Sequence, residues 1–305
     1  MSEDKIKEMT VEEAVEALKE YKEKTGLSQA KIAKKMNVSE GTVSGFLSGT
    51  YKAMESIVPK VQQLIRIESK KEVEPKEPDF KMTTVSSTVL NLIKYCHVSG
   101  KIGIAYGDAG IGKTMAIKKY RKDNPDTAVV ITISPCFATM TGVNELLADE
   151  LHVHEKVSRK IQKEAINKLR GSNKVVIIDE AQHLTVRVIN HLRCIADESG
   201  VGMAFIGNEE IYIKMRGSGQ AAYAQLYSRI ADPEHLLTTD IKKDDIRLLF
   251  EDVEMPDEAV DILYKISHTG YGIRGAVNVF LNTASAFGEI TVSGIAQMAK
   301  KMSIV

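Results

Sequence analysis

The residues best suited to chemistry form a glycine-rich run that ends in lysine and threonine. The run matches the spacing GxxxxGK followed by Thr, and comprises Gly107, Asp108, Ala109, Gly110, Ile111, Gly112, Lys113 and Thr114. Glycines let backbone N–H groups close around phosphate oxygens. We expect Lys113 to reach the β- and γ-phosphates and the Thr114 hydroxyl to bind Mg²⁺. The run predicts an ATP and Mg²⁺ site; the alternative is a strand–helix turn that binds nothing.

Two carboxylates follow a later apolar run, 175–178, which is typical of a buried strand. We expect Asp179 to hold Mg²⁺ through water and Glu180 to polarise the attacking water. A buried strand that ends in acids is common by itself. Together with the glycine-rich run, the pair favours nucleotide hydrolysis over simple binding.

Two more polar residues extend this candidate site. Asn208 follows the apolar run 202–207 and is a candidate to orient the lytic water; the alternative is a turn residue. Arg229 interrupts LYSRI, a stretch that we expect to be helical. It is either a surface side chain or an arginine finger that reaches the γ-phosphate of a neighbouring subunit. A finger would make activity depend on an oligomer.

Short β-branched runs and helical patterns alternate from Thr83 to about Asp240. This alternation predicts an α/β core, a parallel sheet with flanking helices. Residues 1–67 carry a helical pattern, 68–82 are charged and read as a linker, and 241–305 predict a small all-α lid domain.

Residues 25–49 have the pattern of a helix-turn-helix, with Ser28 and Ser39 as N-caps. Its second helix would present Thr42 and Ser44 to the DNA major groove. These side chains are short and no Arg is present to read guanine, so tight sequence-specific binding is not expected. The nearby lysines would contact phosphates instead, namely Lys31, Lys34, Lys35 and Lys52. The alternative is a module that packs against protein.

A second basic cluster lies between the glycine-rich run and the acid pair. It comprises Lys156, Arg159, Lys160, Lys163, Lys168 and Arg170. Lys156, Lys160 and Lys163 fall on one face of a helix, which could grip the DNA backbone in a ring or filament. The alternative is an ordinary solvated face.

The motifs GDAGIGKT, VVIIDEAQHL, FIGN and LYSRI, in this order, resemble those of the AAA+ ATPases. The run GYGIRGA at 270–276 is similar to their second-sensor motif, and this resemblance puts Arg274 on the bound nucleotide. Within AAA+, the helix-turn-helix, ITISPCFATM, VVIIDEAQHL and LYSRIA resemble the DNA-transposition target-selection ATPases, the phage Mu B group. The similarity is strongest over 100–232.

This resemblance implies an ATPase that forms ADP and phosphate and binds double-stranded DNA with little sequence preference. It implies a homo-oligomer, a ring or helical filament, that delivers target DNA to a transposase and is released by hydrolysis. Two alternatives stay open. One is a helicase loader or replication-initiation AAA+ ATPase. The other is a nucleotide-sensing helix-turn-helix transcriptional regulator, against which Glu180 argues.

The composition sets wider limits. The formal net charge is zero, so a DNA surface must come from local clusters of Lys and Arg. Cys96, Cys136 and Cys194 form no CxxC, which favours reduced thiols. The histidines lack a third ligand at metal spacing and are expected to be structural (His152, His154, His183 and His191). Without an apolar run of membrane-spanning length or a signal peptide, we expect a cytoplasmic protein of a bacterium or phage-infected host, with no membrane partner.

Overall fold

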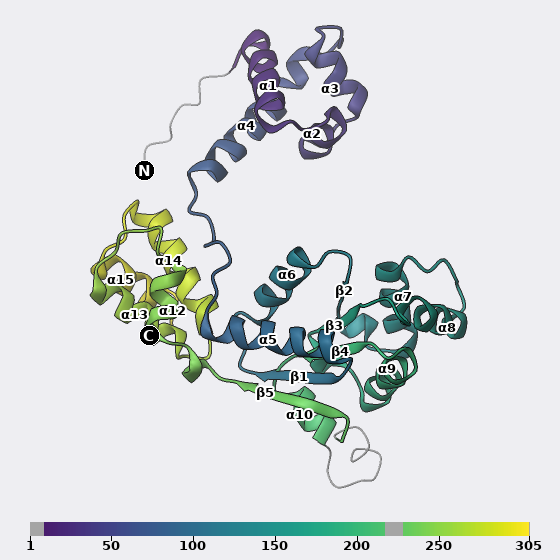
Figure 1. Ribbon diagram of the computed structural model, residues 1–305. Coiled ribbons are helices and arrows are strands. Elements are labelled where there is room, and N and C mark those ends of the chain that lie inside the picture. Colours follow the sequence, from purple (N-terminus) through teal and green to yellow (C-terminus); the bar gives the residue numbers. More distant parts are fainter. Residues whose placement is uncertain (1–8, 217–227, 305) are drawn as a thin grey trace. The chain divides into compact units, whose positions relative to one another are not determined.

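The computed structural model describes residues 9–216 and 228–304 (Figure 1). The chain divides into two compact units, Met1–Pro75 and Lys76–Val305. Each unit has its own hydrophobic core, and each is described by itself below.

The first unit is a bundle of helices that contains the expected helix-turn-helix (Figure 1). Its elements are α1 (Val11–Thr25), α2 (Gln29–Met36), α3 (Glu40–Leu47), η1 (Met54–Ser56) and α4 (Val58–Val73). Ser28 and Ser39 cap α2 and α3 as expected, and Asn37 takes the left-handed conformation at the turn between them, with φ 51°. Leu18, Ile32 and Phe46 fill the core.

One expectation for this unit is corrected. Helix α4 continues to Val73, so the first part of the segment 68–82 is helical rather than linker. Lys35 is held within the unit, where its Nζ donates to Tyr21 Oη at 2.8 Å and to Glu68 Oε2 at 3.0 Å. These contacts raise the pKa of Lys35, mainly through the Tyr21 hydrogen bond. Lys35 is exposed, as Lys31 and Lys34 are, and its contact with DNA phosphate stays a prediction.

The second unit is built on a parallel sheet of five strands in the order β2-β3-β4-β1-β5. The strands are β1 (Ile102–Gly107), β2 (Ala128–Thr132), β3 (Val175–Asp179), β4 (Gly202–Ile206) and β5 (Ile230–Leu236). Strands β1, β3 and β4 are buried throughout, which explains their nearly continuous apolar sequence. The sheet and its helices confirm the predicted α/β fold class.

Strand β5 was not predicted. It contains Asp232, Pro233 and Glu234, and its residues are mostly exposed or half-buried. Because β5 lies at the edge of the sheet beside β1, a proline is tolerated there and one side of the strand needs no apolar cover. Its sequence therefore lacks the apolar signal of the inner strands.

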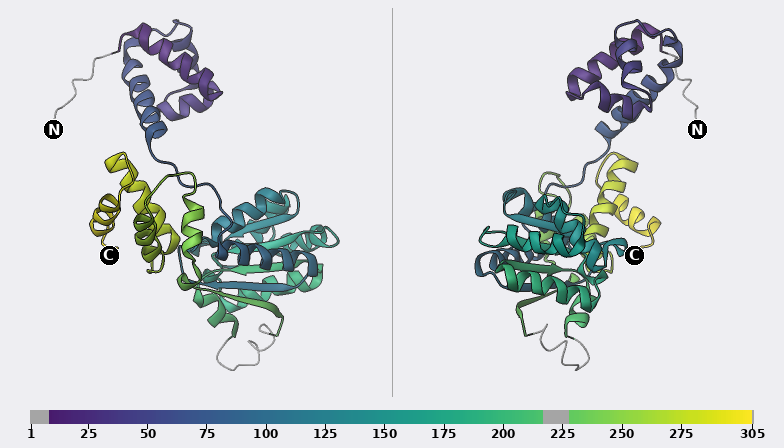
Figure 2. Two further views of the ribbon diagram at one scale, coloured as in Figure 1. Left: turned by 60° about the vertical axis from the view of Figure 1, so that its left-hand side comes forward. Right: turned by 90° about the vertical axis from the view of Figure 1, so that its right-hand side faces the viewer.

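Helices cover both faces of the sheet (Figure 2). On one face pack α5 (Thr84–Ser99) and α6 (Lys113–Asp123). On the other pack α7 (Met140–Leu151), α8 (Ser158–Leu169), α9 (Val186–Ser199) and α10 (Glu209–Arg216). Successive strand residues serve opposite faces: Val175 and Ile177 belong to the first core, Val176 and Ile178 to the second.

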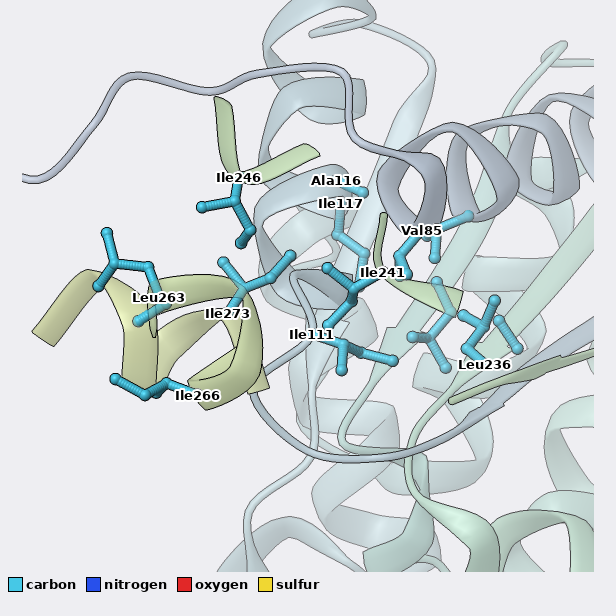
Figure 3. Packing of buried hydrophobic residues seen from close by; sticks show 14 of the residues in the cluster. Val85, Ile111, Ala116, Ile117, Leu236, Ile241, Ile246, Leu263, Ile266 and Ile273 are labelled. Carbon is cyan, nitrogen blue, oxygen red and sulfur yellow. The ribbon is translucent and has the colours of Figure 1, made fainter. Parts of the chain in front are cut away.

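We call residues 241–304 the lid; their regular elements are helices, and their action as a lid stays a prediction. It contains α12 (Lys243–Leu249), α13 (Asp257–Ser267), α14 (Gly272–Phe287) and α15 (Val292–Lys301). The lid shares a hydrophobic cluster with the sheet's α5–α6 face (Figure 3). Ile241, Ile246 and Ile273 from the lid belong to the same buried cluster as Ile111 and Leu236.

A buried carboxylate joins the lid to the start of α5. Asp245 is 6% exposed. Its Oδ1 accepts the Thr84 main-chain N–H at 2.8 Å, and its Oδ2 accepts the Lys242 N–H at 2.8 Å. One side chain thus satisfies N–H groups at the beginnings of two helices, α5 and α12.

We predict that Asp245→Ala lowers the free energy of unfolding by about 2 kcal/mol, because two N–H groups lose their acceptor at a buried position. Urea unfolding followed by circular dichroism measures this loss. The matched control is Asp244→Ala, which removes an exposed carboxylate paired with Arg247 and should cost less than about 0.5 kcal/mol. Equal effects of the two variants would contradict the capping role.

Candidate nucleotide-binding site

A cavity of about 480 Å³ lies where the sheet, the lid and the segment before α5 meet. We call residues 107–114 the phosphate-binding loop and residues 77–83 the strap. Both line the cavity, together with the ends of β3 and β4 and the start of α14. All the predicted nucleotide-site residues from 109 to 114, with Asp179, Glu180, Asn208 and Arg274, face this one cavity.

The phosphate-binding loop follows β1 and leads into α6, which begins at Lys113. Lys113 Nζ donates to the carbonyl oxygens of Gly107 at 3.1 Å and Asp108 at 2.5 Å. Burial lowers the pKa of Lys113, and the negative charge of Glu180 opposes this. The two hydrogen bonds hold the ammonium group against the loop, at the N-terminus of α6. Anions bind at such helix N-termini.

The acid pair lies at the end of β3, directly opposite the loop. Thr114 Oγ1 donates to Asp179 Oδ2 at 2.9 Å, and the Glu180 main-chain N–H donates to Asp179 Oδ1 at 2.9 Å. Burial raises the pKa of Asp179 despite these hydrogen bonds. A hydroxyl and a carboxylate oxygen in contact form the kind of oxygen pair that suits Mg²⁺, so the residues present fit the expected metal.

Asn208 lies at the cavity and also begins a helix. Its Oδ1 accepts the Glu210 N–H of α10 at 2.9 Å. This hydrogen bond agrees with the alternative interpretation, in which Asn208 is a turn residue. Its side chain nevertheless lines the cavity, so its role toward water stays a prediction.

Arg274 enters the site from the lid. Its main-chain N–H donates to Gly110 O at 2.9 Å, and its exposed side chain lines the cavity. The two backbones are so close that a Cβ on Gly110 would lie 2.5 Å from Tyr271 O. The lid thus contacts the phosphate-binding loop directly.

Arg229 does not lie in a helix, contrary to expectation. Ser228 and Arg229 form a turn before β5 and are exposed, while Leu226 and Tyr227 of the motif lie outside the described residues. Arg229 is not among the residues that line the cavity of its own chain. Its role as a finger toward a second chain stays a prediction.

The second basic cluster separates into two groups. Lys168 Nζ donates to Leu151 O and His152 O, and Arg170 donates to Glu198 O, so both serve the unit's own packing. The remaining four are exposed on α8 and the loop before it: Lys156, Arg159, Lys160 and Lys163. In the first unit, Ser44 is exposed, and the half-buried Thr42 contacts Ser39 Oγ at 2.9 Å.

Two parts of the site were missed. The strap lies in the segment 68–82, whose sequence indicates a linker, yet residues 77–81 line the cavity. Lys81 Nζ joins the strap to the lid by ion pairs with Glu251 at 2.6 Å and Asp252 at 3.0 Å. The other is Gln182, which lies at the cavity beside Glu180. The sequence signal for Gln182 is its position two residues after the acid pair in VVIIDEAQHL.

The remaining candidates carry no separate site. In residues 9–216 and 228–304, no three His, Cys, Asp or Glu side chains are grouped to bind a metal. His191 contacts Asn144 Oδ1 at 2.8 Å, and burial lowers its pKa. The cysteines are unpaired, and burial raises the pKa of Cys96 to about 12. None of the helices described here has the length and apolar character needed to cross a membrane.

Comparisons with known proteins agree with this geometry. Residues 97–215 match the AAA domain family. The chain is 28% identical to the Mu-like prophage FluMu DNA transposition protein B of Haemophilus influenzae, over 85% of this chain and 92% of that protein. It is also 28% identical to the ATP-dependent target DNA activator B of Escherichia phage Mu, over 86% and 83%. The crystal structure of Cdc6p from Pyrobaculum aerophilum shares the fold, with a TM-score of 0.56 and 14% identity over 76% and 70%.

We predict that Asp179→Asn stabilises the nucleotide-free protein at neutral pH. Burial disfavours the charged carboxylate, whereas an amide keeps an acceptor for the Glu180 N–H without the charge. Because the folded-state pKa is raised, the cost of Asp179 is present at neutral pH and lost as the pH falls. The stability difference should therefore disappear below about pH 4, where the unfolded carboxyl is also protonated. Urea unfolding at several pH values tests this; a difference independent of pH would contradict it.

Proposed function

We propose that this chain hydrolyses ATP to control its hold on target DNA for a transposase, because residues 97–215 match the AAA domain family and the chain is 28% identical over most of its length to the transposition B proteins of Mu-like phages. Nucleotide binding follows from the AAA domain. The catalytic roles, DNA contacts and assembly set out below are part of the proposal.

The observation that carries the ATPase proposal is the convergence of four groups on one cavity: the Lys113 ammonium, the Thr114–Asp179 pair, the Glu180 carboxylate and the Arg274 side chain. Lys113 and Arg274 supply positive charge for the phosphate oxygens. Thr114 and Asp179 would hold Mg²⁺, which supplies charge neutralisation at the phosphates when bound. Glu180 accepts a proton from the water that attacks the γ-phosphorus, while the bond from that phosphorus to the β–γ bridging oxygen breaks.

The DNA part of the proposal rests on the named relatives and on exposed charge. One relative is an ATP-dependent target DNA activator. Although the net charge is zero, exposed basic residues gather on α8 and the loop before it, and such a face suits the phosphate backbone of duplex DNA. We expect a ring or helical filament in which Arg229 reaches the nucleotide of a neighbouring chain.

The two alternatives differ in client and in DNA preference. A helicase loader or initiation factor would bind a replicative helicase or an origin sequence. The likeness to Cdc6p concerns the fold alone at 14% identity and does not favour this client. A transcriptional regulator would need base-specific contacts, and α3 offers mainly Thr42 and Ser44.

We predict that Glu180→Gln slows ATP hydrolysis by about 100-fold or more, because the proton acceptor is lost. The variant should still bind ATP and should stay longer on random duplex DNA than the wild type. Lys113→Ala should lose ATP binding and with it the ATP-dependent binding of DNA. Phosphate release and fluorescence anisotropy, with no nucleotide, ADP or ATP, measure both steps. DNA affinity that ignores the nucleotide, or appears only on a selected sequence, would favour the regulator instead.

We predict that neutralising the exposed α8 cluster weakens DNA binding without changing ATP hydrolysis in the absence of DNA. The variant replaces Lys156, Arg159, Lys160 and Lys163 by Gln. If all four contact phosphates, the slope of log affinity against log salt falls by about 3 to 4. The control removes the same charge from exposed lysines on other helices, Lys94, Lys122, Lys300 and Lys301. Equal losses in the two variants would contradict a DNA-binding role for this face.

A further inference from the structure

Gln182 lies at the centre of a small polar network beside the cavity. The residue is 9% exposed and belongs to η3 (Ala181–His183), directly after the acid pair. Its Nε2 donates to Glu180 Oε2 at 2.5 Å, and its Oε1 accepts the Asn208 main-chain N–H at 3.2 Å. Its main-chain oxygen accepts a hydrogen bond from Lys214 Nζ of α10. Gln182 thus connects the ends of two strands, β3 and β4, and a helix.

The surroundings fix which way the Gln182 amide points. The main-chain N–H of Asn208 can only donate, so the amide oxygen must face it and the NH₂ group must face Glu180. Space at this position is tight, since a Cβ on Gly207 would lie 2.6 Å from Gln182 Oε1. Rotation of the amide would therefore bring a donor against a donor and an oxygen against a carboxylate.

Both the backbone conformation and the side-chain position of Glu180 need support from neighbouring residues. It is a non-glycine residue with φ 55°, a left-handed conformation that surrounding contacts must maintain. Its flexible side chain has to stand at one place in the cavity if it is to orient water. Among residues 9–216 and 228–304, no side chain other than Gln182 donates a hydrogen bond to this carboxylate.

We infer that Gln182 is a positioning residue for hydrolysis: its amide holds the Glu180 carboxylate where it can polarise the attacking water. This inference rests on the proposed ATPase function and adds to it a residue that acts through Glu180 rather than on the nucleotide. It also assigns α10 a part, because Lys214 and the Asn208 N–H fix Gln182 in turn. A displacement of α10 would be transmitted to Glu180 through this side chain.

The competing explanation is that Gln182 serves only to satisfy the buried N–H of Asn208. Two substitutions separate these roles. Gln182→Glu keeps an oxygen acceptor for Asn208 but replaces the donor to Glu180 by a second carboxylate, which repels it. Gln182→Met keeps the approximate size and removes both polar functions. A purely structural role predicts that Gln182→Glu behaves like the wild type.

The experiment measures steady-state ATP hydrolysis, ATP affinity with a fluorescent ATP analogue, and thermal unfolding for the wild type and the variants. We expect both substitutions to lower kcat by about 10- to 100-fold, since misplacement by about 1 Å has costs of this order. ATP affinity should change by less than about threefold, because Lys113 and the phosphate-binding loop are untouched. The matched control, Gln297→Glu, makes the same chemical change at an exposed position of α15 and should leave all three measurements unchanged.

The outcomes separate this inference from the proposed function. Wild-type turnover together with an unimpaired kcat in Gln182→Glu would overturn the positioning role and leave the ATPase proposal intact. A parallel loss of kcat, ATP affinity and thermal stability in both variants would also overturn it, in favour of a structural role. A wild-type protein with no turnover, with or without DNA, would overturn the proposed function and the inference with it.

Discussion

The phosphate-binding loop depends on main-chain contacts behind it that leave no room for a side chain. A Cβ on Gly107 would lie 1.9 Å from Leu236 O of β5, and Gly107 itself has φ 137°. The next residue strengthens the same contact: the Asp108 N–H donates to Leu236 O at 2.9 Å, and Asp108 Oδ2 accepts the Thr238 N–H at 2.7 Å. A loop that binds phosphate through its own N–H groups must be rigid before the ligand arrives, and β5 provides this rigidity.

A similarly close contact between two backbones joins the lid to the loop. Gly272 of α14 has φ 61°, and a Cβ there would lie 2.8 Å from the backbone of Gly110. Arg274 can therefore donate from its main chain to the loop while its side chain faces the cavity. Behind this contact, apolar side chains of lid and core form one cluster (Figure 3). Packed apolar groups resist small displacements, so movement of the lid must change the loop's surroundings.

The parts of the site that the sequence predicted are those whose chemistry is local. The spacing of Gly107 to Thr114 can be recognised in the sequence alone, and Asp179 follows an apolar run that is typical of a buried strand. The missed parts depend on distant partners. The sequence of the strap is typical of a linker because the partners of its charged residues are distant in the sequence. Lys81, for example, pairs with Glu251. Strand β5 looks irregular because an edge strand tolerates Pro233, and the function of Gln182 depends on Asn208, which is close only after folding.

The buried charges of the site explain why nucleotide binding should affect the whole second unit. Burial lowers the pKa of Lys113 and raises that of Asp179, so each group holds its charge at a cost. A phosphate chain with its metal supplies opposite charges to both groups at once, and binding to the folded state alone stabilises it. That gain is available only when the loop, β3 and the lid are in their places together. The strap adds the last connection, since Lys81 joins it to the lid residues Glu251 and Asp252. We therefore expect nucleotide binding to depend on the position of the lid.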